Sequence, residues 1–134
     1  MDTIVMKFGG TSVQDVEAFQ RVSRIVHEKG GKSPVVVTSA MAKVTDALLD
    51  SFELAKKGNP ENAFSSLDLH FSRHLKVAEA LLDINRQKIF QDELDLVRRE
   101  IKDLLSRVAR RSLPLSILKD AIVSYGELMS SRLL

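Results

Sequence analysis

A run of three valines at residues 35–37, inside the segment 34–38 (PVVVT), constrains the fold more than any other feature. β-branched residues favour strands, and this run does not alternate between apolar and polar positions. We therefore expect a strand that is buried on both faces, as in a parallel sheet. A second β-branched segment, residues 4–8 (IVMKF), lies upstream and ends at Gly9 and Gly10, which indicates a strand followed by a turn.

The segment between these strands predicts a helix over residues 14–29. Acidic residues in its first turn and the glycines 30–31 after its end fit the preferences of helix termini. Strand, helix and strand with short connections form a βαβ unit, whose crossover is expected to be right-handed. The apolar residues at helical spacing are Val16, Phe19, Val22 and Val26.

Beyond residue 39 the apolar spacing becomes helical throughout. It predicts helices over 45–57, 61–82, 86–110 and 116–134, with Tyr125 and Gly126 marking a point where the last helix can break. The predicted fold class is α/β, a βαβ unit followed by a mostly helical segment. Two strands cannot make a sheet covered on both faces, and the chain ends inside an apolar helical pattern, so we expect a chain that is cut short.

Composition excludes several classes of function. The chain has 134 residues, a formal net charge of +2 and 5% aromatic residues, which does not favour a nucleic-acid partner. It has no cysteine, so disulfides, thiolate metal sites and cysteine nucleophiles are excluded. No apolar run approaches the roughly 18 residues of a membrane span, and the first residues lack a signal-peptide pattern. The expected location is the cytoplasm, with no membrane partner.

Residues 7–13 (KFGGTSV) could carry chemistry, because they lie where a strand passes into a helix. Glycines at such a place let backbone N–H groups approach an oxyanion, the helix N-terminus adds partial positive charge, and Lys7 adds an ammonium group. The segment is neither a Walker A loop nor a dinucleotide-binding G-x-G-x-x-G motif. On these residues alone, a tight turn with an exposed lysine is the favoured interpretation.

Two further patterns have structural alternatives. His70 and His74 have a spacing that could hold zinc, but no motif supplies a third ligand, so an exposed helix face is favoured and no metal site is predicted. Thr45, beside Asp46, is expected from its residue type to cap a helix. Arg107, Arg110 and Arg111 are interpreted as a solvated patch, and Phe64, Phe71 and Phe90 as core.

Three motifs together resemble the aspartate kinases, within the amino-acid kinase (carbamate kinase-like) fold. They are residues 7–13, residues 35–41 followed by 43–46 (KVTD), and residues 124–130 (SYGELMS), in the order of that family. Acetylglutamate kinase and glutamate 5-kinase share the fold and the lysine before Gly-Gly. Phe8, residues 11–13 and the Gly126-Glu127 pair favour the aspartate kinases.

The resemblance implies transfer of the γ-phosphoryl group of ATP to the β-carboxylate of L-aspartate, the first step of lysine, threonine and methionine biosynthesis. It implies that Lys7 is catalytic and that ATP phosphates contact Lys7, Gly9, Gly10, Thr11 and Ser12. It places L-aspartate against Ser39, Thr45 and Glu127. Mg²⁺ is expected to accompany ATP, held mainly by parts outside this chain, and a homo-oligomer is expected.

The resemblance also implies a division of the chain. Residues 1–45 hold the phosphate and substrate motifs, 46–115 match a helical insertion, and 116–134 carry the Gly-Glu motif. The whole is expected to be a partial amino-acid kinase domain, about a third of a family chain, and inactive alone because positioning of ATP needs more residues. The alternative from another class is a non-catalytic helical interaction module.

Overall fold

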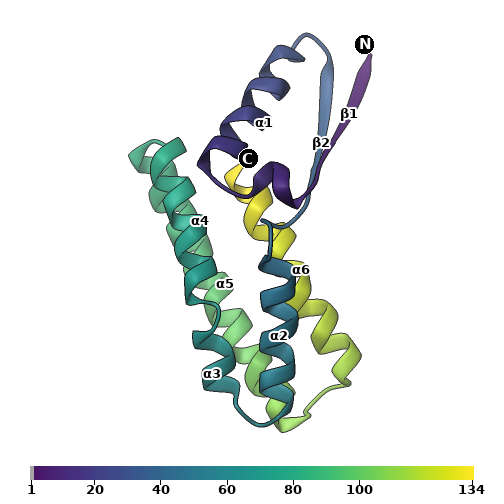
Figure 1. Ribbon diagram of the computed structural model, residues 1–134, viewed down its shortest axis with the longest axis vertical. Coiled ribbons are helices and arrows are strands. Elements are labelled where there is room, and N and C mark those ends of the chain that lie inside the picture. Colours follow the sequence, from purple (N-terminus) through teal and green to yellow (C-terminus); the bar gives the residue numbers. More distant parts are fainter. Residues whose placement is uncertain (1) are drawn as a thin grey trace.

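A computed structural model describes residues 2–134 (Figure 1). The first part contains strand β1 (Thr3–Phe8), helix α1 (Val16–Glu28) and strand β2 (Ser33–Thr38). The two strands are parallel, in a register that pairs Val5 with Val35 and Phe8 with Thr38. The predicted βαβ unit is confirmed, with α1 as the crossover between paired strands. A short 3-10 helix, η1 (Gly10–Val13), precedes α1.

Burial of the valine strand on both faces, expected from the sequence, is wrong for this part of the chain. Val35 is 48% exposed and Val37 46%, and Val5 on the neighbouring strand is 67% exposed. The register places these side chains on one face of the sheet. The described residues form a sheet of only two strands, and this face is not covered. The half-buried residues Ile4, Met6, Phe8 and Val36 lie on the other face.

The remaining elements are helical: α2 (Val44–Lys56), α3 (Pro60–Ser65), α4 (Asp68–Leu81), α5 (Ile84–Arg110) and α6 (Leu115–Leu133). The turn before α3 contains Gly58 at φ +90° and places Pro60 in the first turn of the helix, as turn and helix-start preferences require. Helix α5 starts after Asp83, whose carboxylate accepts a hydrogen bond from the Arg86 amide at 2.9 Å.

Two predicted helix boundaries are wrong. The helix expected over 61–82 is two helices, α3 and α4, separated by a tighter turn in which the Leu67 amide donates to Phe64 O at 3.0 Å, three residues earlier. The break at Tyr125 and Gly126 does not occur, and α6 runs through both. Gly126 is buried there, where a larger residue would not fit.

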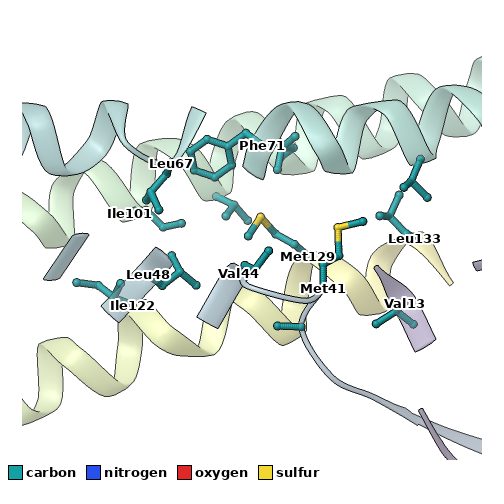
Figure 2. Packing of buried hydrophobic residues seen from close by; sticks show 14 of the residues in the cluster. Val13, Met41, Val44, Leu48, Leu67, Phe71, Ile101, Ile122, Met129 and Leu133 are labelled. Carbon is teal, nitrogen blue, oxygen red and sulfur yellow. The ribbon is translucent and has the colours of Figure 1, made fainter. Parts of the chain in front are cut away.

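The core lies between α2, α4, α5 and α6 (Figure 2). Leu48, Phe71, Ile101 and Ile122 are each 2% exposed or less, and Met129 extends the cluster towards the βαβ unit. Phe71 and Phe90 are core residues as predicted, and Phe64 packs against the core while partly exposed. Figure 1 shows α6 running from the far end of the helical part back to the sheet. Within residues 2–134, no helix is both long and apolar enough to cross a membrane.

Candidate active site

The carboxyl ends of the two strands bring the first two motifs together. Phe8 pairs with Thr38, and directly beyond this pair the Ser39 amide donates to Phe8 O at 3.0 Å. The Ala42 amide donates to Gly10 O at 3.2 Å. The Gly-Gly turn and the loop 39–43 therefore form one edge, the edge at which open α/β sheets place their ligands.

The Gly-Gly turn presents amides and a lysine at this edge. Ser12 N donates to Gly9 O at 3.0 Å, which closes the 3-10 turn and leaves the amides of Gly10 and Thr11 without a partner inside it. A Cβ at position 10 would lie 3.2 Å from Ala40 O, so glycine permits the approach of the two loops. Lys7 is exposed. It lies on the uncovered face of the sheet, opposite Val37.

The expected contribution of a helix N-terminus is not what the structure shows. Helix α1 begins only at Val16, and its N-terminus is capped by the Asp15 carboxylate, which accepts a hydrogen bond from Ala18 N at 2.8 Å. The positive end of α1 is thus already next to a negative charge. The donors that the turn itself offers are therefore the amides of Gly10 and Thr11, with Lys7 nearby in the sequence, and not the N-terminus of α1.

Thr45 is not a helix cap. Lys43 is the N-cap of α2 and has a left-handed backbone, at φ 70°, which is uncommon for a residue with a side chain. The Val44 amide donates to Met41 O at 3.0 Å, and Thr45 follows in the first turn of the helix, half-buried. The capping alternative for Thr45 is wrong because the chain enters α2 two residues earlier, through Lys43.

Helix α6 brings the third motif to the same edge. A Cβ at Gly126 would lie 2.8 Å from the Ala40 Cβ and 3.6 Å from a Val44 methyl, so only glycine allows this close approach. One turn later, the Ser130 hydroxyl donates to the carbonyl of Ser39. Glu127, next to Gly126, is exposed. The structure therefore gathers the segments that carry Lys7, Gly9, Gly10, Thr11, Ser12, Ser39, Thr45 and Glu127 around the ends of two strands.

The exposed face expected for His70 and His74 is wrong. His74 is fully buried, and His70 is half-buried. His74 Nδ1 donates to His70 O at 2.6 Å, while its Nε2 has no hydrogen-bond partner. Burial lowers the pKa of His74 to about 4, despite the opposing effect of that hydrogen bond. Residues 2–134 contain no group of three His, Cys, Asp or Glu side chains that could hold a metal ion.

Sequence reasoning missed one residue at this edge, Arg73 of α4. Its guanidinium donates to Ala42 O at 2.9 Å and to Gln14 O at 3.0 Å, and so contacts both loops. No sequence motif indicates this role of Arg73, because its partners are backbone carbonyls that lie far away in the sequence. A hollow of about 370 Å³ lies elsewhere, lined by α1, β2 and the end of α6, including Val26, Val36 and Leu134.

Comparison with known proteins agrees with this geometry. The model of the amino acid kinase family matches residues 2–134. The chain belongs to the amino acid kinase family. Within the family, similar proteins are aspartokinases: aspartokinase 2 of Arabidopsis thaliana is 31% identical over 98% of this chain, and an aspartokinase of Thermus thermophilus is 45% identical over 63% of it. The resemblance inferred from the three motifs is confirmed.

A solved structure shares the fold over nearly the whole chain. E. coli aspartokinase III in complex with aspartate and ADP superposes with a TM-score of 0.81 and 32% identity over 99% of this chain. The chain spans 28% of that protein and 23% of the Arabidopsis relative. The names of the plant relatives include the word chloroplastic, so the cytoplasmic location expected from the sequence stays a prediction.

Proposed function

We propose that a full-length protein containing this chain is an ATP-dependent aspartate kinase that makes 4-phospho-L-aspartate. The observation that carries the proposal is the meeting of the Gly-Gly turn, the loop 39–43 and the Gly126-Glu127 pair at one edge of the sheet. The similar E. coli protein was solved with aspartate and ADP, which are a substrate and a product of the proposed reaction.

In the proposed reaction, a β-carboxylate oxygen of aspartate attacks the γ-phosphorus of ATP. A new O–P bond forms, the bond from that phosphorus to the β,γ-bridging oxygen breaks, and ADP leaves with the electron pair. No proton has to move in this step, so the protein contributes position and positive potential. Lys7 and the amides of Gly10 and Thr11 supply that potential, with Gly9 and Ser12 shaping the turn.

The other three residues are assigned to aspartate. Glu127 is an acidic group at this edge, and its charge suits the α-ammonium of the substrate. Thr45, in the first turn of α2, offers a hydroxyl to a carboxylate, and Ser39 offers a donor beside the phosphate turn. Gly126 packs against Ala40 and Val44. Glu127 follows Gly126 in the chain and Thr45 follows Val44, so the two substrate residues are adjacent to residues that lie in close contact.

The remaining expectations concern groups that other parts of a full-length chain would contribute. Mg²⁺ is expected to accompany ATP and to be held mainly by the phosphates and by parts of a full-length protein outside this chain. The enzyme is expected to be a homo-oligomer in the cytoplasm. Biosynthesis of lysine, threonine and methionine is the expected pathway.

The proposal is tested by steady-state kinetics of the full-length enzyme, following ADP release with aspartate, glutamate and N-acetylglutamate as acceptors. Aspartate should be the preferred acceptor. Lys7→Ala should lower kcat by roughly 100-fold or more and leave the KM for aspartate nearly unchanged, because charge is stabilised mainly in the transition state. Lys76→Ala, on the exposed side of α4, is the matched control.

Glu127→Gln should raise the KM for aspartate far more than that for ATP, since only aspartate carries an α-ammonium group. Glu79→Gln, exposed on α4, controls for loss of a surface charge. Preference for another acceptor would overturn the aspartate assignment. A kcat of Lys7→Ala within a few-fold of the parent would remove Lys7 from catalysis, and equal losses for both substrates in Glu127→Gln would mean a structural role.

A further inference from the structure

Arg73 is the only side chain of the described residues for which a hydrogen bond to both loops of the candidate site is found. One guanidinium nitrogen, Nη1, donates to Ala42 O at 2.9 Å, and the other, Nη2, donates to Gln14 O at 3.0 Å. Ala42 is 31 residues and Gln14 59 residues away in the chain. A planar guanidinium holds two acceptors at a fixed separation, which a single ammonium group cannot do.

The carbonyls of Ala42 and Gln14 lie where the two loops pass into the next element of the chain. Ala42 immediately precedes Lys43, the residue with the left-handed backbone through which the chain enters α2 and reaches Thr45. Gln14 directly follows the 3-10 helix that carries Gly10 and Thr11, as its C-cap. An uncommon backbone conformation persists where its surroundings hold it, and the Arg73 hydrogen bond acts on the peptide group that joins Ala42 to Lys43.

Arg73 contacts His70, one of the two histidines that the zinc spacing singled out. Arg73 Nη1 lies 3.1 Å from His70 Nδ1, and His74 Nδ1 donates to His70 O at 2.6 Å. A neutral His70 ring can accept from the guanidinium. Burial, and secondarily the charge of Arg73, lower the pKa of His70 and so favour this neutral form. The His70 ring therefore helps to orient the Arg73 guanidinium, whereas His74 contacts only the backbone carbonyl of His70.

We infer that Arg73 is a positioning residue. From the helical part of the chain, it fixes the segment that contains the Gly-Gly turn (residues 9–14) relative to the loop 39–43. This inference rests on the proposed aspartate kinase function. Arg73 touches neither substrate in this assignment. Its effect falls on the distance and alignment between the β-carboxylate and the γ-phosphorus, on which phosphoryl transfer depends.

The test compares Arg73→Met, Arg73→Lys and the control Arg99→Met, on the exposed side of α5, in the full-length enzyme. Arg73→Met keeps the length of the side chain and removes both donors. We expect kcat to fall roughly 10- to 100-fold, as for a displacement of about 1 Å, with KM values for ATP and aspartate within about threefold of the parent. Arg73→Lys should recover only part of kcat, and Arg99→Met should match the parent.

A second pair of variants keeps Arg73 and changes its support. His70→Asn retains an acceptor near the position of Nδ1, and His70→Leu removes it. The first should keep most of kcat and the second should lose part of it. If Arg73→Met does not fold, the ratio of kcat between His70→Asn and His70→Leu tests the positioning role of Arg73 instead. Equal kcat values for these two variants would overturn the inference.

Hydrogen exchange gives a readout that does not need activity. In Arg73→Met, peptides covering residues 9–15 and 40–45 should exchange faster than in the parent, while peptides from α5 should not change. If the parent does not phosphorylate aspartate but Arg73→Met exchanges faster at both loops, the structural role of Arg73 stands and only the proposed function is rejected. Unchanged exchange at both loops, or a kcat equal to the parent's per folded site, would overturn the positioning role.

Discussion

β-branched apolar side chains are buried in the helical part of this molecule but largely exposed on one face of its sheet. Ile101 and Ile122 are completely buried between helices, whereas Val35 and Val37 are nearly half exposed although their segment is the most strand-like in the chain. Helices satisfy their own backbone hydrogen bonds and need one apolar face covered. A strand needs partners at its edges and cover on its faces. An apolar helical pattern is thus completed by nearby helices, while a strand pattern depends on neighbours that need not lie nearby in the sequence.

The largest contrast is expected from shortening one buried and one exposed side chain. Ile101→Ala should lower the free energy of unfolding of the 134-residue chain by about 2–5 kcal/mol, because it removes buried methyl groups and leaves a cavity. Val35→Ala should change it by less than about 1 kcal/mol, since Val35 is 48% exposed. Urea unfolding followed by circular dichroism measures both. Equal losses would mean that the valine face is covered in solution.

His74 should make the stability of the helical part depend on pH. Its pKa falls from 6.5 in the unfolded chain to about 4 in the fold, so the unfolded chain binds the proton more readily. Stability is then complete above about pH 6.5 and falls as the pH drops towards 4, by about 3 kcal/mol at about 1.4 kcal/mol per pKa unit. Unfolding of the parent and of His74→Leu between pH 4 and 7 tests this.

The free energy of unfolding of the parent minus that of His74→Leu should therefore rise by about 3 kcal/mol between pH 4 and about 6.5 and stay constant above that. The lowered pKa of His70 acts in the same direction and is present in both proteins, so it cancels in the comparison. His27→Leu, at an exposed position on α1, is the matched control for the loss of a histidine. A profile unaffected by His74→Leu would contradict the burial of a neutral ring.

The uncovered sheet face should make the isolated chain self-associate. Val5, Val35 and Val37 share this face, and a two-stranded sheet has unpaired edges. We expect light scattering to detect a dimer or larger species that dissociates on dilution, and Val35→Thr with Val37→Thr to weaken it several-fold. Leu69→Ser, at an exposed position on α4, is the control variant. A monomer at high concentration that melts cooperatively would contradict this prediction.

Local signals were enough for most elements. The β-branched segments, the glycines after them and the spacing of Phe19 and Val22 predicted both strands and α1 almost to the residue. In the structure, Gly58 and Pro60 separate α2 from α3 and Asp83 caps α5, as the preferences of helix ends require. These features act over a few residues, so they can be read without knowing the rest of the fold.

Long-range contacts explain the errors. Gly126 looked like a helix break, but the residue is small because Ala40 lies against it. His74 looked exposed because its type is polar, yet its Nδ1 is satisfied within its own helix and the ring packs inward. The assignment of site residues came from motif resemblance; Arg73 belongs to no motif, and its partners are backbone atoms that carry no sequence signal.

The link from Ser130 to the carbonyl of Ser39 has a consequence for synthesis of the protein. The two residues are 91 positions apart, which a ribosome translating roughly 5–20 residues per second covers in about 5–20 seconds. During that interval the strands and the phosphate turn have left the ribosome without the helix that holds the loop. The nascent chain therefore carries its two strands for several seconds before the Ser130 hydroxyl can hold the loop at Ser39, and the rate of translation after β2 sets how long this lasts.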